Sequence, residues 1–214
     1  MAELRRLPEK QSTNVDLPSS CLLALRRLLL YLAVAPPRSL HARHSALVLL
    51  FVDGSADPCA AEPSGFKAGV GACILDSASR EYLFFGGLIP QRILKRWVAQ
   101  GARHVIAQAE LLPVLLARCS FRRLLEGRPF ICFVDNEAAR AGLIRGSSSN
   151  DNSAEIIEEI ICHDMRDHAI GWYARVPSES NLADAPSRGR HPESLAGWAA
   201  PRRVEPDFRA KPFG

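Results

Sequence analysis

The chain has 214 residues, 47% of them hydrophobic, which suffices for one sizeable core with appendages but leaves little room for a second full domain. Lys and Arg outnumber Asp and Glu by 27 to 23, a small excess that permits a polyanionic partner without requiring one. The six cysteines are scattered, with no C-x-x-C pair and no histidine at zinc-ligand spacing. This pattern argues against a zinc module and indicates reduced thiols in an intracellular protein, cytoplasmic or nuclear.

Residues 1–45 are expected to form a linker with one amphipathic helix. Residues 1–20 are polar and interrupted by proline, whereas residues 21–35 are apolar but contain Arg26 and Arg27. The apolar stretch is too short to span a bilayer and starts too late, behind acidic residues, for an ordinary signal peptide. It is either an amphipathic helix that packs on the domain or on a missing neighbour, or a mitochondrial-type address, against which the upstream acids count.

The central strand of the predicted fold ends in an acid. Seven apolar residues, 46–52, lead directly to Asp53 and Gly54, a pattern typical of a strand buried on both faces. An ionised carboxylate beside such a strand is costly unless a cation or a donor compensates it. Asp53 is therefore a candidate metal ligand at or near the strand's end; the alternative is a turn aspartate that bonds its own backbone.

Two further apolar runs, residues 68–76 and 81–89, flank a short polar turn, which predicts a β-hairpin. Together with the first strand they predict an antiparallel three-stranded meander. The glycines of the first run leave little side chain above the sheet, which suits close approach of another backbone or of a ligand.

A basic stretch containing Trp97 follows, over residues 90–103. One interpretation is a loop that faces nucleic acid, because basic side chains can follow a phosphate backbone and an indole can stack on bases. The other is a solvated loop with a packed tryptophan. On the first interpretation Arg96 and Trp97 are candidate substrate-binding residues.

The next segment, residues 104–117, is predicted to be a helix in which Glu110 is the only acid. Pro113 is awkward in a helix interior. Either the regular part begins near Gln108 and makes Pro113 a first-turn proline, or the helix kinks there.

Residues 128–135 repeat the opening pattern, an apolar run that ends in an acid, here Asp135. A helix is expected to about Leu143, and a second one, with a capping box formed by Asn152 and Glu155, to about Arg166. A helical crossover favours parallel strands, which would bring Asp53 and Asp135 side by side at the sheet edge where ligands collect.

The last predicted elements are a strand over residues 168–176 and a short helical or turn segment, 179–188, that contains Asp184. Residues 191–214 are rich in arginine and proline and are expected to form an irregular tail.

Four motifs resemble, in this order, those of the ribonuclease H superfamily, and more closely the ribonuclease H domains of reverse-transcribing elements. They are Phe-Val-Asp53-Gly-Ser-Ala, Ala-Gln-Ala-Glu110-Leu-Leu-Pro-Val, Phe-Val-Asp135-Asn-Glu-Ala-Ala and Val-Pro-Ser-Glu-Ser-Asn181-Leu-Ala-Asp184-Ala-Pro-Ser-Arg188. The resemblance implies a ribonuclease H-like α/β domain over residues 46–190. Its mixed five-stranded sheet would have three antiparallel strands plus two parallel ones, flanked by helices.

The resemblance also implies that Asp53, Glu110, Asp135 and Asp184 are catalytic and hold two Mg²⁺ or Mn²⁺ ions. Two divalent ions that bridge a scissile phosphate need hard anionic oxygen ligands, and four carboxylates converging without metal would repel one another. The implied activity is endonucleolytic cleavage of the RNA strand of an RNA·DNA hybrid. The implied partners are that hybrid and an upstream reverse transcriptase domain, with no membrane.

Several neighbouring residues have weaker assignments. Ser55 and Asn136 are candidates for contacting substrate phosphate or ribose, with turn capping as the alternative. Asn181 and Arg188 are expected to orient Asp184 through local hydrogen bonds. The family's histidine before the last aspartate is missing, and no basic protrusion is evident after residue 143, so activity in isolation is expected to be weak.

Other functions within this fold are less consistent with the residues. Proofreading exonucleases place a glutamate two residues after the first aspartate, where this chain has Ser55. Integrases and transposases end their triad in a glutamate, for which Glu155 or Glu158 could be considered, but the Asn-x-Ala-Asp motif favours ribonuclease H. The remaining alternative is a catalytically weak or inactive ribonuclease H-like module that binds nucleic acid within a polyprotein.

Overall fold

The computed structural model describes residues 18–34, 46–208 and 212–213. The chain divides into two units, Met1–Ala35 and Pro36–Gly214. In the first unit, α1 (Ser19–Val34) lies where the apolar stretch predicts a helix, and several of its leucines are exposed. The expected linker segments 1–17 and 35–45 lie outside the described residues. Within the described ranges, no helix combines the length and the apolar character that crossing a membrane requires.

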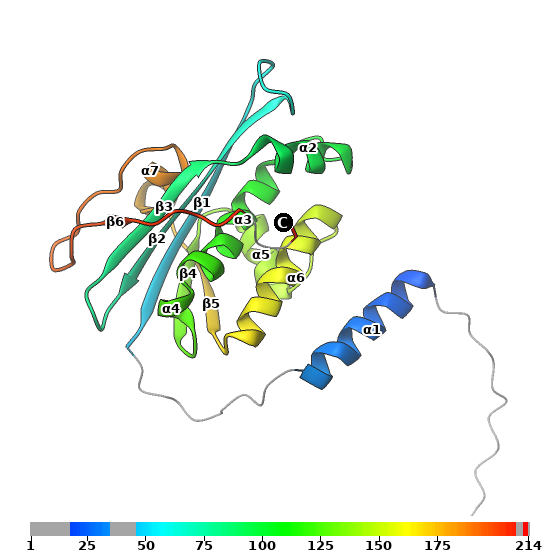
Figure 1. The fold of residues 1–214 in the computed structure, drawn as a ribbon, viewed down its shortest axis with the longest axis horizontal. Coiled ribbons are helices and arrows are strands. Elements are labelled where there is room, and N and C mark those ends of the chain that lie inside the picture. Colours follow the sequence, from blue (N-terminus) through cyan, green and yellow to red (C-terminus); the bar gives the residue numbers. More distant parts are fainter. Residues whose placement is uncertain (1–17, 35–45, 209–211, 214) are drawn as a thin grey trace, which may run out of the picture. The chain divides into compact units, whose positions relative to one another are not determined.

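The second unit is built on a six-stranded sheet with the spatial order β5-β4-β1-β2-β3-β6 (Figure 1). Strands β1 to β3 are antiparallel neighbours, whereas β4 pairs parallel with β1 and β5 parallel with β4. The predicted mixed sheet of three antiparallel and two parallel strands is therefore confirmed. The strands are β1 (Val48–Pro58), β2 (Phe66–Asp76), β3 (Tyr82–Leu88), β4 (Pro129–Val134), β5 (Ile170–Arg175) and β6 (Arg202–Arg203).

The C-terminal segment differs from the predicted irregular tail. Its strand β6 pairs parallel with β3, and Phe213 is buried in the main core. Leu195 and Trp198 pack on the second face of the sheet. An arginine- and proline-rich composition hid this because the few apolar side chains that anchor the segment are widely spaced.

Helices connect and cover the strands: α2 (Gln91–Ala99), α3 (Ile106–Ser120), α4 (Arg122–Leu125), α5 (Glu137–Arg145), α6 (Asp151–Arg166), the 3-10 turn η1 (Ser178–Ser180) and α7 (Asp184–Ser187). The basic stretch after Pro90, predicted as a loop, forms α2, with Ile93, Leu94 and Trp97 buried at helical spacing. Pro113 lies inside α3, which starts before Gln108. The first-turn alternative for this proline is therefore wrong.

The predicted capping box of α6 is also wrong. The cap is Asn150, whose side chain accepts a hydrogen bond from Ser153 N at 3.0 Å. Asn152 is buried at 3% exposure instead. Both asparagines suit an N-cap chemically, and the polar loop before the helix offers no signal that separates them.

The two faces of the sheet are covered differently. In β1 the side chains of Val48, Leu50 and Val52 are fully buried in the main core, and those of Leu49 and Phe51, on the other face, are only partly buried. The strand predicted to be buried on both faces is thus fully buried on one face and partly buried on the other. Figure 1 shows α3 and α6 on one side of the sheet and α7 on the other. Each fully buried valine or leucine contributes roughly 1.5–3 kcal/mol to folding. The face of the sheet covered by α3 and α6 therefore contributes most of the stability.

Candidate metal centre

Three of the predicted carboxylates converge in the structure. Asp53 of β1, Glu110 of α3 and Asp135 directly after β4 each offer an oxygen atom, and these atoms all lie within 4.8 Å of one another. The parallel register that pairs Val52 with Val134 places the two aspartates side by side, as parallel strands predict.

Asp53 lies in the middle of β1 and not at its end. The strand continues to Pro58, but β4 ends at Val134, so beyond this point β1 pairs with β2 alone. The projecting β1–β2 hairpin is visible in Figure 1. The apolar run stops at Asp53 because the parallel neighbour stops there, and the edge that β4 vacates leaves room for carboxylates.

Glu110 reaches this edge because β1 and α3 approach very closely at Gly54. A Cβ atom on Gly54 would lie 2.3 Å from the carbonyl of Ala109, so only glycine permits the contact. That carbonyl is the one that Pro113, four residues later, cannot bond, since proline has no N–H. Gly54 N then donates a hydrogen bond to Glu110 Oε2 at 3.3 Å. The awkward proline and the glycine after Asp53 therefore act together to bring the helix onto the strand.

Glu110 and Asp53 are in an environment that opposes their ionisation. Burial, and then the charges of Asp53 and Asp135, raise the pKa of Glu110 to about 8. Burial also raises the pKa of Asp53 to about 6, opposed by a hydrogen bond from Ser187 and reinforced by the charges of Asp135 and Asp184. Ionising Glu110 and Asp53 together at this buried point is therefore costly unless a cation compensates the charge.

The donor set fits a divalent cation. Asp53 Oδ2 and Asp135 Oδ1 are buried and find no hydrogen-bond partner among the described residues. Buried carboxylate oxygens without donors are costly, and a hard cation such as Mg²⁺ or Mn²⁺ would supply the missing partner. Asp53, Glu110 and Asp135 could therefore hold metal.

Asp184 is not in this group of three. Its Oδ1 accepts from Arg188 Nε at 2.9 Å and its Oδ2 from Arg190 Nη2 at 3.0 Å, so both oxygens are engaged by guanidinium groups. Arg188 thus orients Asp184 directly, as expected. Asn181 also makes the expected local hydrogen bonds, because its backbone carbonyl accepts from Asp184 N at 3.1 Å and its Oδ1 from Ala183 N at 3.2 Å. In addition, its Nδ2 donates to Val52 O at 2.9 Å, which ties the terminal segment to β1 one residue before Asp53.

The short helix α7 lies directly on the glycines of β2 and β3. A Cβ atom on Gly71 would lie 2.4 Å from Ala183 O, and one on Gly86 would lie 2.2 Å from Pro186 O. The prediction that these glycines permit close approach is confirmed, and the approaching group is another backbone. Ser55 Oγ donates to Ser187 O at 3.1 Å and fixes the same contact from β1.

The weaker site candidates have structural partners. Ser55 bonds the backbone of α7 rather than its own turn. Asn136 caps α5 by accepting from Ala139 N at 3.0 Å, and its hydrogen bond to Glu110 lowers the pKa of that carboxyl. Asn136 is therefore both a helix cap and a neighbour of the carboxylates.

The contacts of Arg96 and Trp97 in α2 differ from those expected of substrate-binding residues. Trp97 is 1% exposed and packs edge-on against Phe213 with ring centroids 5.9 Å apart, so its indole is not available for stacking on a base. Arg96 pairs with Glu155 at 2.6 Å and also donates to the carbonyl of Pro212. The helical periodicity of α2 directs these side chains toward the protein. This agrees with the alternative interpretation, in which Trp97 is packed.

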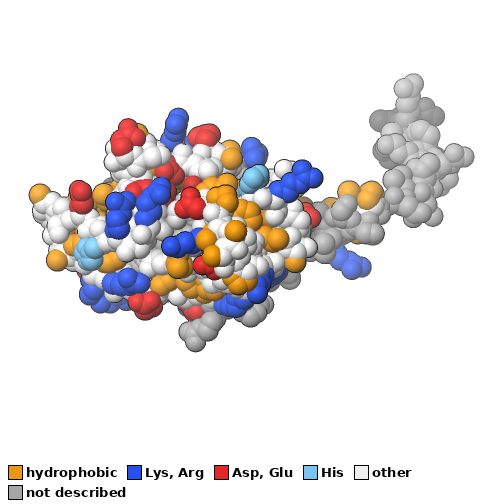
Figure 2. Space-filling model, turned by 90° about the horizontal axis from the view of Figure 1, so that it is seen from above, with side chains coloured by type: hydrophobic (Ala, Val, Ile, Leu, Met, Phe, Trp, Pro, Cys, Tyr) orange, Lys and Arg blue, Asp and Glu red, His pale blue; other side chains and the backbone are white. Residues whose placement is uncertain are grey.

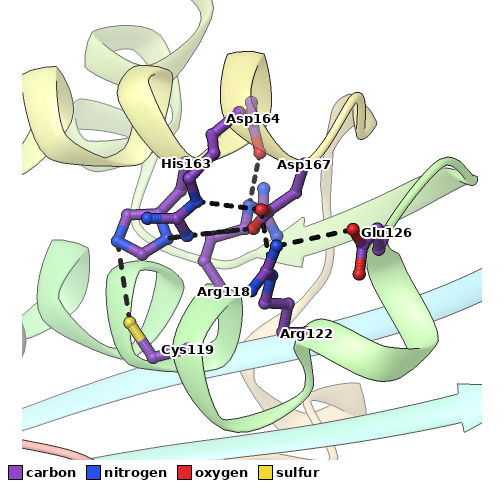
Figure 3. Close-up of polar contacts among 8 residues, drawn as sticks. Arg118, Cys119, Arg122, Glu126, His163, Asp164 and Asp167 are labelled. Carbon is purple, nitrogen blue, oxygen red and sulfur yellow. Dashed lines mark hydrogen bonds and ion pairs between the residues drawn. The ribbon is translucent and has the colours of Figure 1, made fainter.

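A polar network that the sequence did not reveal joins α3 to α6 (Figure 3). Arg118, 1% exposed, donates from Nε to Asp164 Oδ1 at 2.6 Å and lies over the ring of Phe130, 4.0 Å from its centroid. Arg118, a charged residue in the otherwise apolar stretch of α3, is the sequence feature that could have indicated this network. The network fixes the helix that carries Glu110.

The same network places Cys119 Sγ 3.7 Å from His163 Nε2 (Figure 3). Burial raises the pKa of the Cys119 thiol to about 11 and lowers that of His163 to about 4. Both groups are therefore neutral at neutral pH, and the pair lacks the thiolate that nucleophilic catalysis requires.

The order and directions of the strands define a ribonuclease H-like α/β fold, and three carboxylates, two of them buried, meet where β4 ends beside β1. The fold class rests on the order and directions of the strands themselves.

No family model and no curated protein matches the sequence. Among solved structures, ribonuclease H1 of the archaeon Halobacterium salinarum is 14% identical over 66% of this chain and 95% of its own, with a TM-score of 0.43. LC11 ribonuclease H1, solved in complex with an RNA/DNA hybrid, is 16% identical over 67% of this chain and 95% of its own, with a TM-score of 0.45. The protease-reverse transcriptase of prototype foamy virus is 15% identical over 72% of this chain and 22% of its own, with a TM-score of 0.48.

Proposed function

We propose that this chain is a divalent-metal-dependent endonuclease that hydrolyses the RNA strand of RNA·DNA hybrids. The observation that carries the proposal is the convergence of Asp53, Glu110 and Asp135 from three separate elements, with two buried oxygens that have no donor among the described residues. A protein gains nothing structurally from such an arrangement, because it places repelling charges in a desolvated position.

The residues present supply ligands and hold them in position. Asp53, Glu110 and Asp135, with Asp184 as the fourth ligand, would hold two Mg²⁺ or Mn²⁺ ions. When bound, such ions activate a water for attack on a phosphodiester and stabilise the leaving oxygen. The backbone N–H of Gly54 orients the Glu110 carboxylate.

The substrate class and the biological context come from the four motifs. Their order and their local sequence resemble the ribonuclease H domains of reverse-transcribing elements, and we propose that the chain is part of a retroelement reverse transcriptase. In this proposal residues 46–190 form the catalytic domain, residues 1–45 a linker from an upstream polymerase domain, and residues 191–214 a C-terminal tail.

The test is cleavage of a labelled RNA·DNA hybrid in Mg²⁺ and in Mn²⁺, with single-stranded RNA and duplex DNA as competitors. Asp135→Asn should abolish cleavage. The matched control is Asp57→Asn, which removes an exposed carboxylate from the same strand as Asp53 but outside the group of three, and should retain cleavage. Cleavage that survives in Asp135→Asn would contradict the proposed site.

The outcome also separates the nuclease from the scaffold. A hybrid that is bound but left uncut in both metals would overturn the nuclease proposal and favour a nucleic-acid-binding module. The same experiment on single-stranded RNA decides whether the substrate class is the hybrid.

A further inference from the structure

The fourth carboxylate, Asp184, is engaged by the side chains of two arginines. Arg188 and Arg190 each bond one oxygen of Asp184, and their side chains are 55% and 63% exposed. Ion pairs at such exposure are weak and exchange readily. Asp184 therefore has a stable structural position but replaceable partners.

The backbone around Asp184 is closely packed and hydrogen-bonded, which favours movement of side chains over movement of the main chain. Helix α7 rests on Gly71 and Gly86 with no space for a Cβ atom, and Ser55 bonds its last residue. Asn181 anchors the preceding turn to β1. Any change of partner at Asp184 must then come from rotation of its carboxylate or withdrawal of the arginines.

Arg188 lies near the carboxylate group. It directly follows Ser187, whose backbone carbonyl accepts a hydrogen bond from Ser55, and Ser55 is two residues after Asp53 in β1. A guanidinium that bonds a carboxylate through Nε and Nη can bond a phosphate in the same way, because both present oxygens at similar spacing. A phosphodiester at the metal centre would thus lie close to donors that Asp184 now occupies.

The distribution of charge on the surface makes the guanidinium groups of these two arginines important for binding nucleic acid. On the face shown in Figure 2, Lys and Arg side chains are interspersed with Asp and Glu side chains, and the described residues of that face form no continuous basic surface. Nucleic acid binds through phosphate contacts with unpaired positive charge, so paired arginines contribute little until they are released.

We propose that Arg188 and Arg190 bind backbone phosphates of the nucleic acid and are held in reserve by Asp184, which frees them when its carboxylate turns to the metal site. The proposal rests on the proposed function and deepens it. Metal would draw Asp184 away from the arginines, and nucleic acid would draw the arginines away from Asp184, so each would favour the binding of the other.

The test measures binding without metal, so that no cleavage occurs. Anisotropy of a fluorescent RNA·DNA hybrid in EDTA is compared for the wild type, Asp184→Asn and Asp57→Asn. Both variants lose one negative charge near Arg188, but only the first removes a partner of the arginines. We expect Asp184→Asn to bind roughly threefold to tenfold more tightly than Asp57→Asn, the range that two exposed ion pairs allow.

Substitution of the two arginines provides the decisive comparison. In the background of Asp184→Asn, replacing both Arg188 and Arg190 by Gln should remove the gain and lower the slope of log affinity against log salt by about 1 to 2, since each phosphate contact contributes about 0.9. If Asp184→Asn binds no more tightly than Asp57→Asn, or if its gain survives without the arginines, the proposal is wrong. Asp184→Ser repeats the comparison if the asparagine variant does not fold.

This outcome is independent of the cleavage assay. A hybrid that is never cut, together with the expected binding pattern, would overturn the nuclease proposal and retain the role of the arginines. Cleavage of the hybrid, with no effect of Asp184→Asn on metal-free binding, would support the nuclease proposal and overturn the proposed role of the arginines.

Discussion

Replacing Glu110 by Gln should stabilise the metal-free protein at alkaline pH. Burial, and then the charges of Asp53 and Asp135, raise the pKa of Glu110 from 4.5 to about 8. A carboxyl whose pKa is raised in the folded state contributes stability that is fully present below its unfolded pKa and is lost as the pH rises through the folded value. The wild type should therefore lose stability between about pH 4.5 and pH 8 or 9.

The size of the loss follows from the two pKa values. Each tenfold change in an ionisation constant corresponds to about 1.4 kcal/mol, so the rise from 4.5 to about 8 limits the effect to about 5 kcal/mol. Glutamine removes the ionisation but retains an oxygen that can accept from Gly54 N. It also removes a charge that opposes ionisation of Asp53. We expect a gain of about 2 to 5 kcal/mol in the free energy of unfolding at pH 9, and little gain at pH 5.

Urea unfolding in EDTA, followed by circular dichroism from pH 5 to pH 9, measures this. The control is Glu205→Gln, which should follow the wild-type profile because the Glu205 side chain is 81% exposed and pairs with Arg203 at the surface. Adding Mg²⁺ at pH 8 should restore stability to the wild type more than to Glu110→Gln. If the free energy of unfolding of Glu110→Gln differs from that of the wild type by the same amount at every pH, the argument that Glu110 is a buried, repelled carboxyl is refuted.

Three further substitutions test how the site is held. Gly71→Ala should displace α7 and lower the melting temperature, because the new Cβ atom would lie 2.4 Å from backbone atoms, whereas Gly87→Ala, with nothing within 4 Å, should have a much smaller effect in the same thermal scan. Asn181→Ala should cost roughly 1–3 kcal/mol in urea unfolding, because it leaves the buried β1 carbonyl without this donor. Arg118→Met should cost about 3–5 kcal/mol in the same assay, because it leaves the carboxylate of Asp164 without its buried cation. Variants as stable as the wild type would show that these contacts do not hold the site.

Much of the fold could be predicted because its signals are local. The apolar runs predict β1 to β4, and the general preference for parallel strands across a helical crossover is enough to bring Asp53 and Asp135 together. Where the local signal was ambiguous, the prediction failed: the basic composition of α2 concealed a buried helical stripe, and two asparagines were equally suitable caps for α6. The C-terminal strand β6 is too short to have a periodicity of its own.

The sequence by itself determined the identity of the carboxylates and the elements that carry them, because residue type and strand or helix period are properties of neighbouring residues. Only the tertiary structure decided how these residues meet. Glu110 lies near Asp53 because Gly54 admits the backbone of α3, and Asp184 faces two arginines because α7 lies flat on the glycines of β2 and β3. These contacts join residues far apart in the chain, and their distances depend on how closely whole elements pack, for which no stretch of sequence carries a separate signal.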